Sequence, residues 1–396
     1  MSDETKASAT VSDYLRWRGD LTFAQDGFNE VDNLLLCIIS YIKLENIPRL
    51  RSFDPQDAMP MGDVCRLLTE EDEQLGLSTL DYIPLMRQAA ETPRFREVSL
   101  FAFESLHDED RQMQFAAVSF LLPDGSVYAA YRGTDMTIVG WQEDFNMSFL
   151  SAVPAQVKAA EYAEAVARAC PRRALRIGGH SKGGNLAAWA AVHLDEKLQR
   201  QRLIAAYNND GPGFSRDLVD TPSYQAVADR LFTYIPASSI VGVLLEHAED
   251  YEVVDSTARS IMQHEPLSWC VEGPRFVHLG QRSQLGQLSD GVLREWIGSM
   301  SPQEREQFSR AFFDILSRGG RTKTLEDLRS GGLAAGAALI REYAGADEEK
   351  KKIIFEIFRR LAVDVKDELV KAAGAGVRRA GESILATGQA IADLRK

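Results

Sequence analysis

The feature that most constrains the fold of this chain is the stretch RIGGHSKGGNLAAWAA, which runs from Arg176 to Ala191. A short apolar run, ALRIGGH, leads into it, and an Ala-rich helical pattern follows it. Between the two lies a Gly-x-Ser-x-Gly motif centred on Ser181. Small neighbours let such a serine stand on a sharp strand-to-helix turn with its hydroxyl projecting from the sheet edge. The motif therefore predicts a sheet strand that turns directly into a helix at Ser181.

The chain up to about residue 285 alternates between short apolar runs and helical patterns. Two apolar runs flank Pro123-Asp124-Gly125 and predict a hairpin. Three further runs, RLIAAYNND, RLFTYIP and DYEVVD, each end in polar or turn residues and predict strands. Helical patterns cover residues 155–170 and 184–199. Strands that alternate with helices indicate an α/β fold, with a mostly parallel central sheet and helices on both faces.

The composition divides the chain into three segments. We expect a flexible tail at residues 1–19, an α/β domain at residues 20–285 whose first 70 residues are mostly helical, and a helical C-terminal extension at residues 286–396. The extension is poor in strand patterns, and its Ser301-Pro302-Gln303-Glu304 stretch predicts a helix start.

An apolar residue recurs every seven positions near the end of the chain. This spacing predicts a narrow apolar seam on a helix, which suits packing on the chain's own domain or self-association. A membrane surface is the less favoured alternative, because the polar face of this helix carries charges of both signs. The seam residues are Val363, Val370, Val377, Ile384 and Ile391.

Charge and cysteine spacing exclude several classes of protein. The formal net charge of −13 disfavours a nucleic-acid partner. The four cysteines are scattered, without the spacing of a metal site or a disulfide framework. The sequence also lacks a phosphate-binding loop and a dinucleotide fingerprint, so no cofactor and no metal are expected. The N-terminal residues lack the pattern of a signal peptide, and a cytoplasmic location is expected.

Two motifs together carry a family resemblance. The stretch YRGTDMTIVGWQEDFNMSF, followed by GGHSKGGNLAAWAA, resembles the class 3 lipases of the α/β-hydrolase superfamily. It resembles more closely a bacterial family of lipase-like hydrolases of unknown function. The resemblance covers roughly residues 25–285 and implies an α/β-hydrolase fold. It also implies that Ser181 is a nucleophile and that Thr134 and the backbone N–H of Lys182 form an oxyanion hole.

Lys182 departs from the class 3 lipases, which usually carry an apolar residue at this position. Its charge would lie beside Ser181, where it could favour anionic or polar acyl substrates. The alternative is that the side chain extends into solvent.

A serine becomes a good nucleophile only beside a base, and the sequence holds six histidines. In this fold the catalytic histidine follows the last strand of the sheet. The order of a strand (YEVVD), a loop and then His264 favours His264. His278, at the end of the run RFVH, is the second candidate, and His247 is the remaining one.

The acid that would orient the base is harder to identify. Class 3 lipases carry an Asp where this chain has Ser239. The best substitute is Asp210 in YNNDGPGF, although a role in capping the turn before Gly211 is favoured over catalysis. Asp255 is another candidate. A third possibility is a Ser–His dyad whose imidazole is held by Ser238, Ser239 or a backbone carbonyl.

The sequence therefore favours a serine hydrolase, an esterase or lipase-like enzyme that acts on a small ester or lipid-like molecule. Ser181 and His264 would form a nucleophile–base pair and pass through an acyl-enzyme intermediate. The alternative is a non-catalytic α/β-hydrolase scaffold with a binding or assembly role. The absent Asp and the apolar seam motivate that alternative.

Overall fold

The computed structural model describes residues 8–69, 82–134, 138–147, 150–239, 241–283 and 300–316, together with residues 345, 348 and 351. The chain divides into two compact units, one of residues 1–135 and 152–283 and one of residues 136–151 and 284–396. The apolar seam expected at residues 363–391 lies outside the described residues. The boundary at 285 between an α/β domain and a helical extension stays a prediction.

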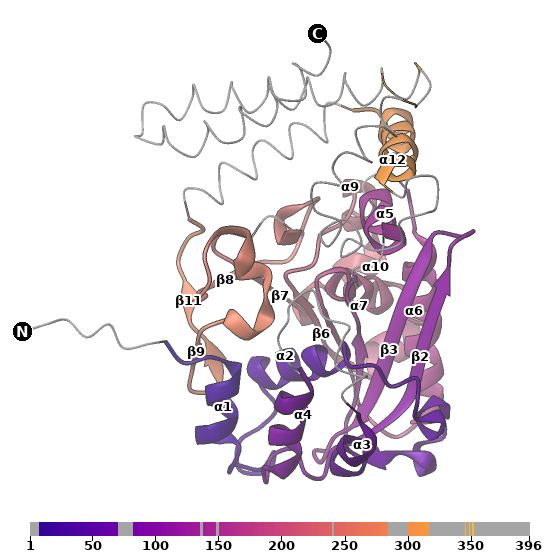
Figure 1. The fold of residues 1–396 in the computed structure, drawn as a ribbon. Helices are drawn as coiled ribbons and strands as arrows, with labels where there is room; N and C mark the ends of the chain where they lie inside the picture. The colour runs from indigo at the N-terminus through magenta and orange to yellow at the C-terminus, as the bar shows by residue number, and fades with distance from the viewer. Residues whose placement is uncertain are drawn as a thin grey trace, which may run out of the picture. The chain divides into compact units, whose positions relative to one another are not determined.

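The described part of the first unit is built on a nine-stranded sheet in the order β1-β2-β3-β4-β5-β6-β7-β8-β11 (Figure 1). The central strands β4 to β8 are parallel, and the strands at both edges pair antiparallel. This is the mostly parallel sheet of an α/β-hydrolase fold, as predicted. The strands are β1 (Met59–Pro60), β2 (Ser99–Asp108), β3 (Met113–Leu121), β4 (Val127–Tyr131), β5 (Leu175–His180), β6 (Leu203–Asn209), β7 (Leu231–Pro236), β8 (Tyr251–Val254) and β11 (His278–Leu279).

Most of the predicted strands are confirmed, but β2 was missed. The predicted hairpin is β3 and β4, and the other apolar runs form β5, β6, β7 and β8. The pairing of β2 with β3 shifts register between Phe101 and Glu104, and Ala102 adopts a positive φ of 53°. Such a bulge breaks the alternation by which a strand is predicted from sequence. A separate two-stranded hairpin consists of β9 (Val271–Glu272) and β10 (Arg275–Phe276).

Helices cover both faces of the sheet, and two successive glycines of β5 show why they can approach closely. A Cβ on Gly178 would lie 2.8 Å from Oδ1 of Asn33, on helix α2 (Glu30–Ile39). A Cβ on Gly179 would lie 2.1 Å from the backbone of Gly183, on helix α7 (Lys182–His193). Successive strand residues point to opposite faces, so α2 and α7 pack on opposite sides of β5.

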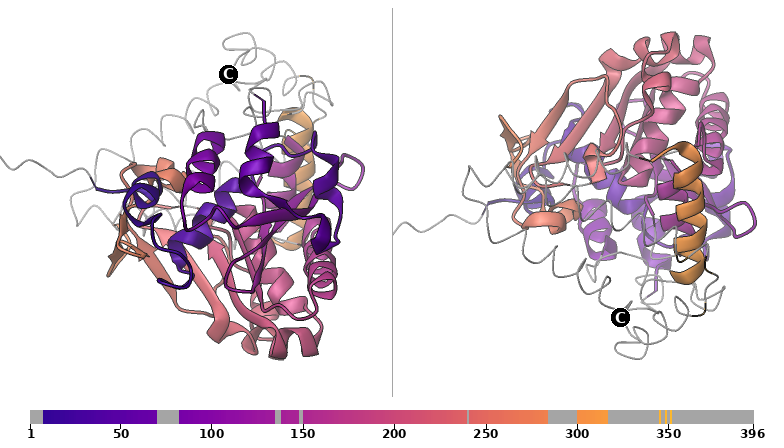
Figure 2. Two further views of the ribbon diagram at one scale, coloured as in Figure 1. Left: turned by 90° about the horizontal axis from the view of Figure 1, so that it is seen from below. Right: turned by 90° about the horizontal axis from the view of Figure 1, so that it is seen from above.

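The other helices extend these two layers (Figure 2). Helix α6 packs beside α7, while α1 and α4 pack beside α2, and α3 packs on α4. The remaining helices of this unit are α1 (Val11–Arg18), α3 (Met61–Leu67), α4 (Tyr82–Glu91), α6 (Pro154–Ala169), α8 (Glu196–Gln201), α9 (Arg216–Val219) and α10 (Pro222–Gln225). Short 3₁₀ helices are η1 (Pro48–Arg51), η2 (Pro55–Asp57), η4 (Ala228–Arg230), η5 (Val241–Val243), η6 (Ser260–His264) and η7 (Pro266–Ser268).

Two expectations for the helices are corrected. The tail expected at residues 1–19 contains helix α1, because Val11, Tyr14 and Leu15 are buried against the neighbouring helices. The single helix expected at residues 184–199 is two helices, α7 and α8. The break occurs because the Asp195 side chain accepts the backbone N–H groups of Lys197 and Leu198, which starts a new helix.

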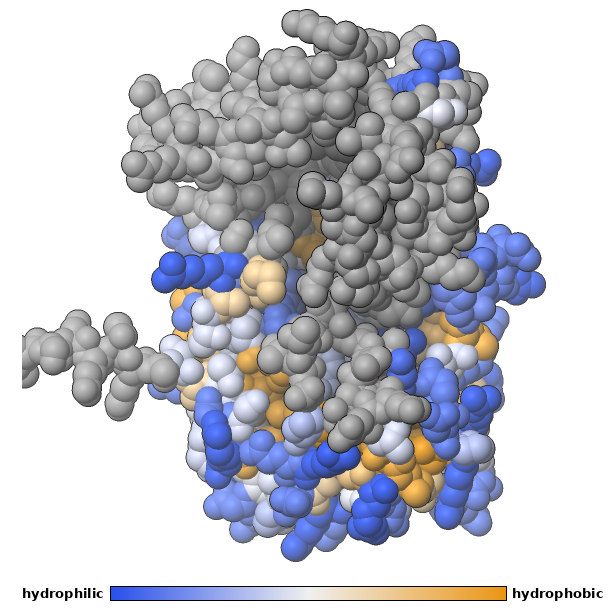
Figure 3. Space-filling model, viewed as in Figure 1, coloured by the Kyte–Doolittle hydropathy of each residue, from blue (hydrophilic) through white to orange (hydrophobic). Residues whose placement is uncertain are grey.

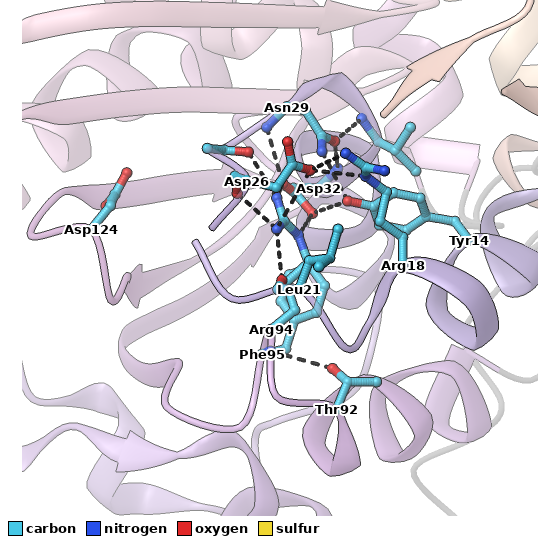
Figure 4. Close-up of polar contacts among 12 residues, drawn as sticks. Tyr14, Arg18, Leu21, Asp26, Asn29, Asp32, Thr92, Arg94, Phe95 and Asp124 are labelled. Atoms are coloured by element: carbon cyan, nitrogen blue, oxygen red, sulfur yellow. Dashed lines mark hydrogen bonds and ion pairs between the residues drawn. The ribbon is translucent and has the colours of Figure 1, made fainter. Parts of the chain in front are cut away.

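A buried ion pair joins α2 to the segment that follows α4 (Figure 4). The Arg94 guanidinium donates to both carboxylate oxygens of Asp32, at 2.7 and 2.5 Å, and both side chains are fully buried. Arg94 also donates to three backbone carbonyls, those of Leu21, Asp26 and Gly27, and the Tyr14 hydroxyl donates to Asp32. All these groups need their partners, because an unpaired buried charge is costly.

We therefore expect Arg94→Ala to lower the free energy of unfolding by about 3–5 kcal/mol, because it leaves the Asp32 carboxylate buried and unpaired. Urea unfolding of the purified protein measures this. The control is Arg16→Ala, which removes an exposed ion pair with Asp13 and should cost about 0–1 kcal/mol. Equal costs for the two variants would contradict the assignment of the Arg94–Asp32 pair as a structural anchor.

The described part of the second unit contains α5 (Ile138–Asn146) and α12 (Pro302–Leu316). The predicted start of α12 is confirmed, since the Glu304 side chain accepts the Ser301 backbone N–H while the Ser301 hydroxyl accepts that of Glu304. The rings of Phe308 and Phe145 lie 5.3 Å apart, and the Ser309 hydroxyl donates to Asn146.

Where the described surface is visible in Figure 3, hydrophilic residues alternate with smaller apolar patches. No helix among the described residues is long and apolar enough to cross a bilayer.

Candidate active site

Ser181 lies on a strained turn between β5 and α7. Its backbone has φ 58° and ψ −132°, which a residue with a side chain rarely adopts. The Ser181 N–H donates to the carbonyl of Asn209 on β6 at 2.9 Å, which holds the turn against the neighbouring strand. Gly179 and Gly183 leave the room that the close approach of β5 and α7 requires. The sharp turn expected from the Gly-x-Ser-x-Gly motif is therefore present.

A buried polar network supports this turn from the α2 side of the sheet. The Asn33 side-chain amide donates to Oδ1 of Asn209 at 2.9 Å, across 176 residues of sequence. The Asn209 amide in turn donates to the carbonyl of Gly179 at 2.9 Å. The hydroxyl of Tyr128, on β4, donates to Asn33 Oδ1 at 2.6 Å. Helix α2 and strands β4, β5 and β6 are thus tied together directly behind Ser181.

His264 and Asp210 form a close pair near the same edge of the sheet. His264 ends η6, and its Nδ1 lies 2.6 Å from Asp210 Oδ2. The His264 side chain is 19% exposed, whereas that of Asp210 is fully buried. The carboxylate accepts the Nδ1 proton, and the other ring nitrogen is then left free to accept a proton.

Asp210 directly follows β6 and is held from several sides. Its backbone has a positive φ of 54°, and its N–H donates to the carbonyl of Tyr234 at 2.8 Å. Oδ2 accepts the Ser239 hydroxyl at 2.8 Å, and Oδ1 accepts the Gly242 N–H at 3.1 Å. The carboxylate is therefore oriented toward His264, while the choice between a role in catalysis and a role in the turn before Gly211 stays a prediction.

The other proposed holders of the imidazole lie elsewhere or act indirectly. Ser239, where the class 3 lipases carry their Asp, hydrogen-bonds to Asp210. The Ser238 hydroxyl pairs with that of Ser283 at 2.7 Å. Asp255 accepts the backbone N–H of Ser256. The carboxylate that contacts His264 thus follows β6, one strand nearer to β5 than the position of Ser239.

His180 precedes Ser181 and packs against His264. The two rings lie 4.6 Å apart, and His180 Nε2 lies 2.8 Å from the carbonyl oxygen of His264. A carbonyl only accepts, so Nε2 donates, and Nδ1 accepts the Tyr41 hydroxyl at 3.0 Å. Burial and, secondly, the neighbouring His264 hold the pKa of His180 well below the usual value of a histidine. His180 is thus neutral and supports the backbone of His264.

The remaining histidine candidates have other surroundings. His278 lies beside the carboxylates of Glu30 and Glu252, at 2.8 and 3.2 Å. His247 is paired with Glu249 and with the carbonyl of Gly242. Of the three, only His264 contacts Asp210 among the described residues.

The end of β4 lies directly against the Ser181 turn. A Cβ on Gly133 would lie 2.6 Å from the carbonyl oxygen of His180 and 3.1 Å from Cβ of Ser181. The next residue, Thr134, is buried. Lys182 is the first residue of α7, where a backbone N–H has no acceptor within the helix. Thr134 thus follows the residue that approaches the Ser181 turn, and Lys182 follows Ser181 in the chain; their role in an oxyanion hole stays a prediction.

The side chain of Lys182 is not in solvent, which corrects one expectation. It is 1% exposed, and its ammonium donates to the backbone carbonyl and to Oε1 of Gln114, both at 2.7 Å. The ammonium group of Lys182 therefore binds at the N-terminal end of β3. Sequence spacing gave no signal for this contact, because the two residues are 68 positions apart.

The predicted pair of Ser181 and His264 is not in direct hydrogen-bond contact. Within the described residues no hydrogen bond joins the Ser181 hydroxyl to His264, a gap that is common in sites without a bound ligand. Sequence reasoning missed Gly242 and Tyr41 as supports of the site, and it named Ser239 as a holder of the imidazole, whereas the Ser239 hydroxyl donates to Asp210. Among the described residues, no group of three or more His, Cys, Asp or Glu side chains could hold a metal ion.

The sequence model of a protein family described as Mbeg1-like matches residues 89–314, more than half of the chain. The chain belongs to the Mbeg1-like family. The matched range contains Ser181, Asp210 and His264 of this Mbeg1-like protein.

Two solved lipase structures are similar to this Mbeg1-like protein at low levels. The Lip2 lipase of Yarrowia lipolytica has 14% identity and a TM-score of 0.34, with 63% of this chain and 91% of that chain covered. The Rhizomucor miehei lipase in its propeptide complex has 15% identity and a TM-score of 0.33, with 44% and 72% covered. No curated protein sequence matches the chain significantly.

His180 predicts how the stability of this Mbeg1-like protein depends on pH. Its pKa is lowered in the folded state, so below about pH 6.5 only the unfolded chain takes up this proton. The free energy of unfolding should therefore fall as the pH decreases, by at most about 1.4 kcal/mol per pH unit for this group.

Urea unfolding between about pH 7.5 and about pH 5.5 tests this in the wild type and in His180→Gln, whose slope should be flatter. His107→Gln is the control, because His107 is exposed and its replacement should leave the slope unchanged. Equal slopes for wild type and His180→Gln would refute the buried neutral state.

Proposed function

We propose that this protein is a serine hydrolase that cleaves carboxylic esters through an acyl-enzyme intermediate. The single observation that carries the proposal is the 2.6 Å bond between His264 Nδ1 and the fully buried Asp210, beside the strained turn of Ser181. A strained serine on a strand-to-helix turn, a histidine and a buried carboxylate are the parts that acyl transfer uses. The choice of an ester over a thioester or an amide follows the resemblance to class 3 lipases.

The first chemical step forms the acyl-enzyme. Ser181 Oγ attacks the ester carbonyl carbon, and His264 Nε2 takes the hydroxyl proton. Asp210 accepts the Nδ1 proton in a hydrogen bond and stabilises the imidazolium that forms. The negative oxygen of the tetrahedral intermediate is bound by Thr134 and by the Lys182 backbone N–H.

The second half of the reaction restores the enzyme. The imidazolium returns its proton from Nε2 to the leaving alkoxide, so the C–O bond breaks and an alcohol departs. A water molecule then gives a proton to His264 while its oxygen attacks the acyl carbon. Collapse of this second intermediate releases the carboxylic acid and returns the proton to Ser181.

A fluorophosphonate probe tests the nucleophile without knowledge of the substrate. We expect covalent labelling of Ser181 in the wild type, established by peptide mapping, and none in Ser181→Ala or His264→Ala. Asp210→Asn should label more slowly than the wild type but still detectably, because removal of the acid slows catalysis without abolishing it.

The result that would overturn the proposal is a folded wild-type protein that takes no label, with or without detergent. That outcome would favour the non-catalytic scaffold. Far-UV circular dichroism of each variant shows that loss of label is not loss of fold.

The oxyanion hole gives a separate prediction. Thr134→Val removes the hydroxyl with little change in volume, and it should lower the rate of ester hydrolysis by about 10²–10³-fold if that hydroxyl binds the oxyanion. Hydrolysis of p-nitrophenyl esters of short and medium chain length measures the rate. An unchanged rate would assign this role to other donors.

A further inference from the structure

We propose that His247 and Glu249 are positioning residues that hold the acid of this site through the backbone of Gly242. The inference rests on the proposed function, because it assigns Asp210 the role of orienting His264. It concerns a second histidine–carboxylate pair, on the loop between β7 and β8.

Glu249 is the buried centre of this second pair. Its side chain is 2% exposed and accepts bonds from three elements of the fold. Thr233 on β7 donates to Oε1 at 2.5 Å, Tyr224 on α10 donates to Oε2 at 2.6 Å, and His247 Nδ1 lies 3.1 Å from Oε1. Burial would raise the pKa of Glu249, but these donors hold it below its usual value. The carboxylate is thus a fixed anion.

Both ring nitrogens of His247 face acceptors. Nδ1 faces the Glu249 carboxylate, and Nε2 lies 2.8 Å from the backbone carbonyl oxygen of Gly242. Each of these two acceptors is a partner for a ring N–H. The ring is therefore held at both ends, and it fixes the position of the Gly242 carbonyl.

Gly242 connects the two histidine–carboxylate pairs. Its carbonyl binds His247, and its N–H donates to Asp210 Oδ1 at 3.1 Å. A Cβ at this residue would lie only 2.3 Å from the same oxygen, so the backbone lies directly against the carboxylate. A displacement of Gly242 would therefore change the hydrogen bonds of Asp210 and the direction in which it faces His264.

The loop that carries these residues is fastened to the segment that follows Asp210. Phe214 and Glu246 exchange two backbone hydrogen bonds, at 2.8 and 2.9 Å, and Gly213 donates to the carbonyl of Leu244. Leu245 between them has a positive φ of 68°, a strained conformation. His247 is the polar side chain that connects this strained loop to the buried Glu249. Loss of its ring should let the loop relax away from Asp210.

The experiment compares the kinetics of fluorophosphonate labelling in wild type, His247→Ala and His247→Gln. We expect His247→Ala to lower the limiting first-order rate constant by about 10- to 100-fold, with the half-saturating probe concentration unchanged. His247→Gln should recover most of the rate, because its amide can still donate to the Gly242 carbonyl. The control is His193→Ala, which removes an exposed histidine that is bonded to the Trp189 carbonyl, and it should label at the wild-type rate.

A purely structural role would reduce the fraction of protein that labels but not the rate constant of the folded fraction. An unchanged rate constant for His247→Ala would therefore overturn the inference while leaving the proposed function intact. Absence of label in the wild type would overturn both. If His247→Ala does not fold, Glu249→Gln provides the same comparison, because it keeps the shape and removes the charge of the carboxylate. A wild-type rate for Glu249→Gln would also overturn the inference.

Discussion

The fully buried carboxylate of Asp210 is the group on which the arrangement of the candidate site depends. Its two oxygens accept hydrogen bonds from a ring nitrogen, a hydroxyl and a backbone N–H, which come from the two segments that follow β7 and β8. A buried charge is tolerated only with such partners. The need to satisfy it therefore gathers His264, Ser239 and Gly242 at one edge of the sheet, next to the turn that carries Ser181.

Local sequence patterns predicted the parts of the structure whose causes are local. The apolar runs predicted β3 to β8, and the glycines around Ser181 predicted the sharp turn. The order of strand and loop was enough to favour His264. In each case the signal is local, because strand periodicity, turn chemistry and helix capping each depend on only a few neighbouring residues.

The acid could not be predicted with the same certainty, because its role depends on contacts distant in sequence. Asp210 precedes a Gly-Pro-Gly stretch, which is typical of a turn. Ser239 occupies the position at which the class 3 lipases carry an Asp. The two are joined only when the loop after β7 folds back over β6. The surroundings of Lys182 and the helix within the expected tail were misjudged for the same reason, since Gln114 contacts Lys182 and Asp32 contacts Tyr14 from remote positions.

The amide of Asn33 has a consequence for the order in which the chain can fold. It supports the Ser181 turn through Asn209, a partner that the ribosome adds 176 residues later. A nascent chain therefore cannot complete this support of the turn when β5 and α7 emerge, although α1, α4 and β4, on which α2 also packs, are already present. Contacts of such long range slow folding. The N-terminal helix that supports the site therefore completes its contact with it only after β6 has been added to the sheet.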